Sequence, residues 1–324
     1  MLRILGAFLS LILLILLFGA LAPFYDQQFL WPPSALAANF ETIAAQTVIV
    51  SLGAIGMTVI IASAGIDLSF GSVVALAMVV SALAFNYWES SALAALAGVA
   101  TGALCGLVNG AAITGFRIVP FIATLGMMGV ARGAAELLAD ETMVNPASSV
   151  WKASWLKPLM ETLPDSKWLW IVRGVWILLL FAVAMALVLR HTVFGRYVFA
   201  IGSNEATARL CGIRVKTMKV LIYTLAGAFS GLAGVMFFSR QGQGDPTAAG
   251  GWELDVIAAV VIGGGSLNGG EGSILGSLIG AFIMGVLRYG LDKIGVSNPI
   301  QRILIGGIII AAVVVDQLRQ RRAE

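Results

Sequence analysis

The stretch from Arg190 to Lys219, RHTVFGRYVFAIGSNEATARLCGIRVKTMK, is a long polar segment between two apolar runs. It carries six of the twenty lysines and arginines of the chain and a single acidic residue, Glu205. Basic loops between membrane spans stay in the cytoplasm, because positive charge resists translocation. The stretch therefore indicates how the chain is oriented in a membrane, and it predicts a face that a soluble partner contacts.

A short helix is expected inside this stretch, over residues 204–211. Ser203 is expected to cap it by accepting a hydrogen bond from an amide of the first turn, where the helix dipole also favours the negative charge of Glu205. Gly212 is expected to end it in the left-handed conformation. Because two helical turns are unstable alone, the segment is interpreted either as a helix that docks in a partner's groove or as a capped helix on a solvated loop.

The composition predicts an all-α polytopic membrane protein. Hydrophobic residues make up 59% of the 324 residues and charged residues 11%, whereas soluble domains have about 45–50% and about 25%. A net charge of +3 is too small to indicate a nucleic-acid surface. Two cysteines and one histidine offer no disulfide framework, metal site or Ser-His-Asp triad. We therefore expect neither a metal site nor a catalytic residue.

About ten spans are expected, because a membrane helix needs ~20 apolar residues. The apolar runs lie at 2–21, 42–63, 71–87, 91–113, 119–139, 171–190, 219–238, 273–290 and 299–316, with a shorter one at 253–264. With the N-terminus inside, the C-terminus and residues 190–219 fall in the cytoplasm and residues 23–40 form an outer loop. Residues 140–167 also fall outside, as an interfacial anchor or a docking surface for an extracellular partner.

Glycines interrupt the apolar runs at AGIDLSFG (64–71) and GGGSLNGGEGSILG (263–276). Broken helices are tolerated in lipid only where their backbone is buried in protein or lines a cavity. One interruption lies in each half of the chain, so residues 42–139 and 219–316 are predicted to be inverted structural repeats within a single domain, 1–324. Gly276, Gly280 and Gly285 are expected to form a close packing face.

Charged residues inside these spans each have a structural interpretation and a functional alternative, which is a catalytic carboxylate pair for Glu253 and Asp255 and a role in the transport pathway for Arg132 and Glu136. Asp67 either caps the helix that follows it or contacts a polar solute. Glu253 and Asp255 lie in a helical first turn, where the dipole favours anions, and Arg240 is the expected cationic neighbour. Arg132 and Glu136 are spaced for an ion pair within one helix.

Four motifs stand out along the chain, IGMTVIIASAGIDLSFGSVVAL (55–76), VPFIATLGMMGVARG (119–133), FGRYVFAIGSNEATARLCGI (194–213) and WELDVIAAVVIGGGSLNGGEGSILGSLIGA (252–281). Together they resemble the permease subunit of bacterial ABC importers of the ribose, xylose, arabinose and galactose class, close to galactofuranose-type permeases. Trp252, Gly265 and Glu271 stand where the family often has tyrosine, threonine and a basic residue.

The resemblance implies a non-catalytic subunit in the bacterial inner membrane with both termini cytoplasmic. Its implied partners are membrane lipid, a second permease subunit, a cytoplasmic ABC ATPase and a periplasmic sugar-binding protein. No cofactor is expected on this chain, because it has no GxxxxGK[ST] motif and ATP and Mg²⁺ would be bound by the ATPase. The residues implied to contact the ATPase as a coupling helix are Gly202, Ser203, Asn204, Glu205, Ala206, Arg209, Leu210 and Gly212.

An uncharged sugar suits a pathway lined by weakly polar side chains, with few charges. The pathway candidates are Thr47, Ser51, Thr58, Asp67, Ser69, Asn109, Thr124, Glu253, Asp255 and Asn268. The alternative function is an ion-coupled secondary carrier for a small polar solute, which also uses broken helices. It would need an ionisable residue near the membrane midplane. An intramembrane enzyme would need a catalytic constellation, which the sequence does not offer.

Overall fold

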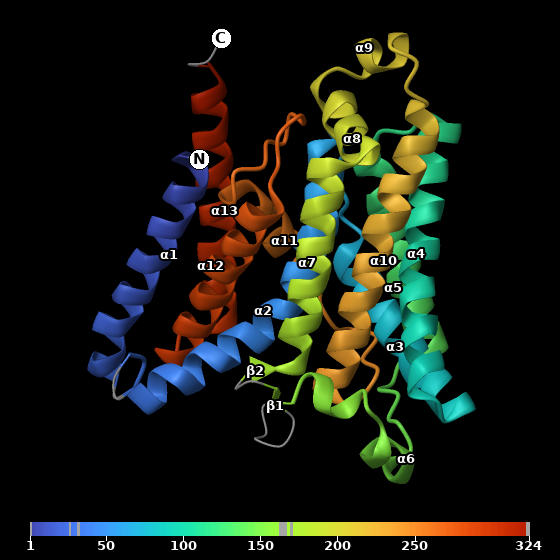
Figure 1. The fold of residues 1–324 in the computed structure, drawn as a ribbon. Helices are drawn as coiled ribbons and strands as arrows, with labels where there is room; N and C mark the ends of the chain where they lie inside the picture. Colours follow the sequence, from blue (N-terminus) through green and yellow to red (C-terminus); the bar gives the residue numbers. More distant parts are fainter. Residues whose placement is uncertain (1, 26, 31–32, 162–166, 169–170, 322–324) are drawn as a thin grey trace.

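The computed structural model describes residues 2–25, 27–30, 33–161, 167–168 and 171–321, which form a bundle of helices (Figure 1). The α-helices are α1 (Leu2–Leu21), α2 (Pro33–Ala62), α3 (Phe70–Trp88), α4 (Ser91–Gly115), α5 (Pro120–Leu138), α6 (Ser148–Ala153), α7 (Arg173–His191), α8 (Val193–Ser203), α9 (Glu205–Leu210), α10 (Val215–Gln241), α11 (Trp252–Ile262), α12 (Ile274–Lys293) and α13 (Asn298–Arg321). Two short 3₁₀ helices are η1 (Ala22–Tyr25) and η2 (Lys157–Leu159). The strands β1 (Lys167–Trp168) and β2 (Ile171–Val172) form one antiparallel pair.

The predicted all-α polytopic fold is confirmed. Each of the ten predicted spans falls on a helix. Within the described residues, eight helices are long and apolar enough to cross a membrane, namely α1, α2, α3, α4, α5, α7, α10 and α12. Helix α11 has 11 residues, about half of the ~20 that a bilayer crossing needs.

Two predicted loops are shorter than the sequence suggested. Residues 33–40, assigned to an outer loop, are the start of α2, which runs for 30 residues. A proline at the first position of a helix is favourable, because its missing N–H would be unpaired there anyway. The basic stretch contains a further helix, α8, in which the Thr192 side chain accepts a hydrogen bond from the Gly195 amide at 3.4 Å. Trp31 and Pro32 lie outside the described residues.

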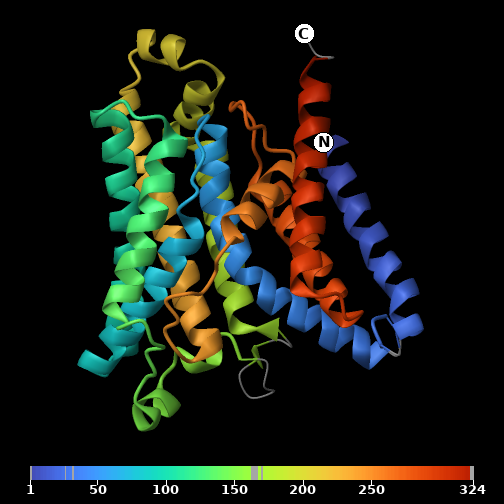
Figure 2. The same ribbon diagram turned by 180° about the vertical axis from the view of Figure 1, so that it is seen from behind.

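Helices α4 and α10 pack with their backbones in direct contact (Figure 2). Gly102 and Gly106 lie one helical turn apart on α4, and a Cβ atom on either would overlap the backbone of α10. Opposite Gly102 lie Gly227 and Gly231, which are also one turn apart. Small residues permit this approach, which supplies packing energy between helices in a membrane.

The glycine face predicted on α12 divides between two neighbours. Gly276 and Gly280 lie against α11, where added Cβ atoms would overlap the carbonyl oxygens of Gly263 and Ala259. Gly285 instead faces the side chain of Thr47 on α2. Helix α12 is therefore held closely against both α11 and α2.

Two non-helical passages interrupt the bundle, residues 63–69 between α2 and α3 and residues 242–251 between α10 and α11. Helix α5 contacts both. The Leu68 amide donates to Thr124 Oγ1 at 3.1 Å, and the Arg132 guanidinium donates to the carbonyls of Pro246 and Ala248. Arg132 thus bonds to the second passage, where the sequence suggested an ion pair with Glu136 in its own helix.

The two passages bring the starts of α3 and α11 together. Gly71, in the first turn of α3, lies against the Ala249 carbonyl, and a Cβ atom there would be 2.7 Å from Glu253 Oε2. Gly53 on α2 makes room for the Phe70 ring and the Val256 side chain. The two helix starts therefore meet beside α2 inside the bundle.

We predict that Gly102→Ala lowers the melting temperature of the purified protein in detergent. The new methyl group overlaps the backbone of Gly227 and Gly231, and overpacking of this kind costs about 1–3 kcal/mol. Gly126→Ala on α5 is the control, because a Cβ atom there meets nothing within 4 Å. Equal melting temperatures for the two variants would show that the contact between α4 and α10 is not close.

Candidate functional site

Helices α8 and α9 cover one end of the bundle (Figure 1). The helix predicted at 204–211 is α9, and the Asn204 side chain caps it by accepting from the Thr207 amide at 2.8 Å. The predicted cap, Ser203, is instead the last residue of α8. The backbone of Asn204 is extended, as a capping residue requires. Gly212 has a φ of +84°, which confirms the predicted left-handed end.

Helix α9 is held to α10 by charge on one side and by apolar contacts beneath. Glu205 pairs with Lys219 of α10 at 2.6 Å and with Arg209 of its own helix at 2.9 Å. The hydrogen bond from Lys219 lowers the pKa of the Glu205 carboxyl below its ordinary value, and Arg209 adds to the effect. Ala208 is buried against Ile201 and Val215.

The outer surface of α9 is exposed. Leu210 is 88% exposed at its end, and Cys211 beside it is also exposed. A leucine this exposed on a short helix with a fixed underside is suited to burial in a partner's groove.

The end of α8 contacts the end of α2 and the loop before α12. Gly202 is packed against the carbonyl of Ala62 at the end of α2 and against the amide of Gly270 in the loop 263–273. That amide donates to the same Ala62 carbonyl at 3.0 Å. A side chain at 202 would overlap both groups. We call this three-way contact the Gly202 junction.

The first passage contains a buried polar network. Asp67 Oδ1 accepts from the Ser69 amide at 2.8 Å and from the Ser69 hydroxyl at 2.6 Å. Asn109 of α4 donates to the same hydroxyl at 3.1 Å. These bonds give Asp67 a local structural role at the start of α3, and they account for three of the pathway candidates.

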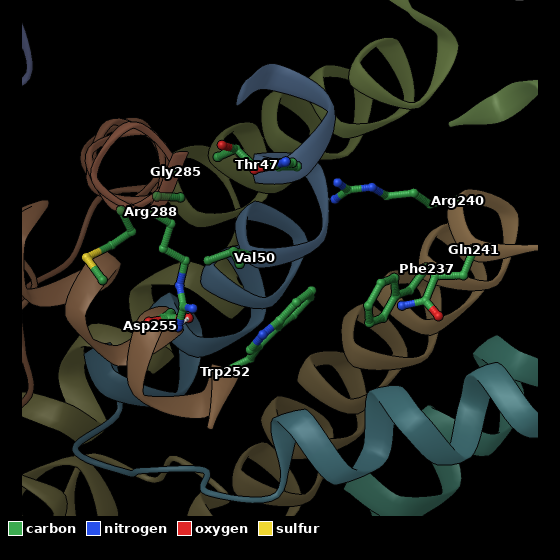
Figure 3. Close-up of a pocket in the computed structure, with 12 residues that line it drawn as sticks. Thr47, Val50, Phe237, Arg240, Gln241, Trp252, Asp255, Gly285 and Arg288 are labelled. Carbon is green, nitrogen blue, oxygen red and sulfur yellow. Dashed lines mark hydrogen bonds and ion pairs between the residues drawn. The ribbon is translucent and has the colours of Figure 1, made fainter. Parts of the chain in front are cut away.

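A cavity of about 390 Å³ lies between α2, α10, α11 and α12 (Figure 3). Trp252 stacks on Phe237 with ring centroids 4.8 Å apart and an interplanar angle of 24°. Arg288 of α12 donates to Asp255 Oδ2 at 2.5 Å. Asp255 thus pairs with Arg288, where the sequence suggested Arg240.

Three polar groups at this cavity have bonding capacity left over. Asp255 Oδ1 and Arg288 Nε are buried and have no hydrogen-bond partner in the described chain. Arg240 extends from α10 toward α2 across the cavity (Figure 3) and forms no hydrogen bond or ion pair with a described residue. Buried polar groups are nearly always satisfied, so these atoms suit a polar ligand.

The sequence-derived candidates fall into separate places. Thr47 and Asp255 line the cavity. Glu253, in the first turn of α11, instead lies against Gly71 at the start of α3. Thr124 supports the first passage. Thr58 joins α2 to α12 by donating to Ser277 Oγ at 2.7 Å, and the Ser51 hydroxyl is buried without a hydrogen-bond partner among the described residues. Asn268 is exposed in the loop 263–273.

Sequence reasoning missed the cavity's two arginines and its tryptophan as site residues. Arg288 was the more recognisable, because it is a lone cation within an apolar span, where charges generally mark function. Its partner Asp255 is 33 residues away, so only the packing of α12 on α11 brings them together. Among the described residues, no cluster of three or more His, Cys, Asp or Glu side chains could hold a metal ion.

The chain matches one protein family and is similar to several known proteins over most of its length. Residues 39–313 match the family model described as branched-chain amino acid transport system / permease component. The chain is 39% identical to the ribose import permease protein of Escherichia coli K12, over 89% of this chain and 90% of that one. It is 37% identical to the Bacillus subtilis ribose import permease protein, over 97% and 92%. It is 36% identical to the fructose import permease protein of Rhizobium meliloti, over 87% and 78%. No solved structure was found that matches the chain.

We predict that Arg132→Met destabilises the protein, because the carbonyls of Pro246 and Ala248 lose their charged donor. Each hydrogen bond from a charged group contributes about 1.5–3 kcal/mol, so the melting temperature in detergent should fall clearly. Arg196→Met is the control, because Arg196 is exposed on α8. An unchanged melting temperature for Arg132→Met would exclude its support of the second passage.

We predict that α9 loosens as the pH falls. The pKa of Glu205 is lowered in the folded protein, so its pairing stabilises α9 above the unfolded pKa of about 4.3 and is lost as the pH falls through the folded pKa. Hydrogen-exchange protection of residues 204–213, corrected for intrinsic exchange rates, should decline below about pH 4.3. Glu205→Gln should show low protection at every pH. A flat profile for the wild type would refute this.

Proposed function

The chain belongs to the family of branched-chain amino acid transport system permease components and is a multi-pass, non-catalytic permease subunit of an ABC importer; from this premise we propose that its cargo is a monosaccharide. Relatives over most of its length are named ribose and fructose import permeases. Residues toward the bundle interior include hydroxyl and amide groups such as Thr47, Ser51 and Asn109, which suit an uncharged, hydroxyl-rich solute.

We propose that α9 is the coupling helix that receives force from a cytoplasmic ABC ATPase. The observation that carries this proposal is the Gly202 junction, since α8 leads directly into α9 and contacts the end of α2 and the loop before α12. ATP and Mg²⁺ would be bound by the ATPase, because this chain has no phosphate-binding motif. Movement of α9 would then bias the two passages between inward-open and outward-open states.

The other partners belong to the same proposal. A second permease subunit, identical or paralogous, would complete the pathway, and a periplasmic sugar-binding protein would deliver the cargo. Helix α1 begins and α13 ends toward the α9 end of the bundle (Figure 1). With α9 in the cytoplasm, as the basic residues of the stretch 190–219 favour, both termini would be cytoplasmic. The predicted repeats, 42–139 and 219–316, would be the two halves that move against each other.

An ion-coupled carrier has less support. It needs an ionisable residue whose protonation or ion binding is free to change. Asp67 is bonded to Ser69, and Arg132 is bonded to two backbone carbonyls. Both residues therefore have structural roles that account for their presence in the membrane.

We predict that Leu210→Asp abolishes co-purification with the ATPase while the permease stays folded in detergent. The side chain is 88% exposed, so the change costs the isolated subunit little, but a charge cannot be buried in an apolar groove without a large penalty. Gly212→Val should act similarly, because its φ of +84° disfavours a β-branched residue.

The control is Met143→Asp, which places the same charge at an exposed apolar residue in the loop after α5, at the opposite end of the bundle from α9. It should leave the complex intact. Normal stimulated ATP hydrolysis by a complex containing Leu210→Asp would refute the coupling role of α9.

A further inference from the structure

We propose that the cavity between α2, α10, α11 and α12 is a binding station for one neutral monosaccharide inside the permease. Trp252 is its apolar platform, and Asp255, Arg288 and Arg240 are its polar partners. The inference rests on the proposed function, because it assigns the cargo to a particular place. The cavity volume of about 390 Å³ falls in the range of small-molecule sites, about 300–1,000 Å³.

The ion pair of Asp255 and Arg288 provides the recognition chemistry. Asp255 is 1% exposed, and its Oδ1 atom has no partner in the part of the chain that the structure describes, while Oδ2 is bonded to Arg288. The Arg288 Nε group is buried and forms no hydrogen bond with a described residue. One free acceptor beside one free donor matches a pair of neighbouring hydroxyls, because each hydroxyl can donate and accept.

Trp252 provides the surface on which a sugar ring can rest. One side of its indole is covered by Phe237, which fixes the ring, and Val50 and the ion pair lie on its other side (Figure 3). The C–H groups of a pyranose ring form an apolar face that packs on an aromatic ring, while its hydroxyls point outward. A platform with a few placed polar groups is the usual composition of a ligand site.

The charges at the cavity do not require an anionic ligand. Asp255 and Arg288 balance each other. Arg240 lies in the last turn of α10, where the helix dipole stabilises a cation without a bound anion. Its guanidinium has five N–H donors, which can contact several hydroxyls. A sugar acid is the competing ligand, and D-gluconate tests it beside the neutral sugars.

The cavity lies far from the α9 end of the bundle. Arg240 comes 25 residues after Val215, the first residue of α10, so a rise of 1.5 Å per residue separates them by roughly 38 Å. In the proposed orientation the cavity is on the outer side of the membrane, where a sugar released by the binding protein would enter.

The test is protection of an introduced thiol in the full-length permease, purified in lipid nanodiscs. Gln241→Cys places the thiol at the exposed rim of the cavity, in a Cys211→Ser background, since the remaining Cys105 is buried. The rate of maleimide labelling is measured with D-ribose, D-fructose, L-arabinose and D-gluconate. At a concentration about three times Kd, a bound sugar should slow labelling about fourfold.

The variants identify which side chains carry the protection. Asp255→Asn, Arg240→Gln and Trp252→Ala should each raise the sugar concentration needed by about tenfold, the effect of losing one good contact. Arg240 has no partner in the described chain, so Arg240→Gln should fold normally even if Asp255→Asn does not. Leu254→Ala is the control on α11, because Leu254 is 47% exposed and does not line the cavity.

Import by the complete transporter separates this inference from the proposed function. If the reconstituted complex imports a sugar but no neutral sugar protects the thiol, the binding station is wrong and the importer stands. Protection by gluconate alone overturns the neutral ligand, and protection unchanged in Asp255→Asn, Arg240→Gln and Trp252→Ala overturns the assignment. If the wild-type complex imports no monosaccharide with ATP, the proposed function itself fails.

Discussion

Two stretches of backbone inside this bundle are not helical, so their amides and carbonyls lack the hydrogen bonds that a helix provides. The rest of the structure depends on how these polar groups are bonded. In lipid each unpaired amide or carbonyl costs several kcal/mol, so the passages at 63–69 and 242–251 need donors and acceptors from neighbouring helices. Helix α5 supplies them to both, through Thr124 and Arg132. This explains why a buried threonine and an arginine occur in α5.

The same constraint limits how the molecule can move. If α5 slid relative to either passage, the hydrogen bonds that Arg132 donates or the one that the Leu68 amide donates to Thr124 would break without water to replace them. The close contact of α4 with α10 resists sliding too, because glycine backbones interlock there. Motion is therefore expected between groups of helices that each keep their internal bonds. At the Gly202 junction, α8 contacts two such groups, through the end of α2 and through the loop before α12.

The cavity differs from the first passage in what its polar atoms have left to bond. Asp67 Oδ1 and Thr124 Oγ1 are bonded within the protein, whereas Asp255 and Arg288 each retain a buried atom without a partner in the described chain. From the sequence, Asp67, Thr124 and Asp255 were equivalent pathway candidates and Arg288 was not among them, because residue type and hydropathy do not reveal hydrogen-bond partners. Only the three-dimensional packing separates structural polar groups from those available to a ligand.

Sequence alone was enough to predict the fold class, the positions of ten apolar segments, the breaks at AGIDLSFG and GGGSLNGG, and the short helix that Gly212 ends. These features follow from local composition and backbone preference, which depend on residues close together in the sequence. The cap at Asn204, the partners of Arg132 and the pairing of Asp255 with Arg288 were decided by tertiary structure. Each depends on the exact register of a helix or on residues far apart in the chain, and packing alone brings those groups within bonding distance.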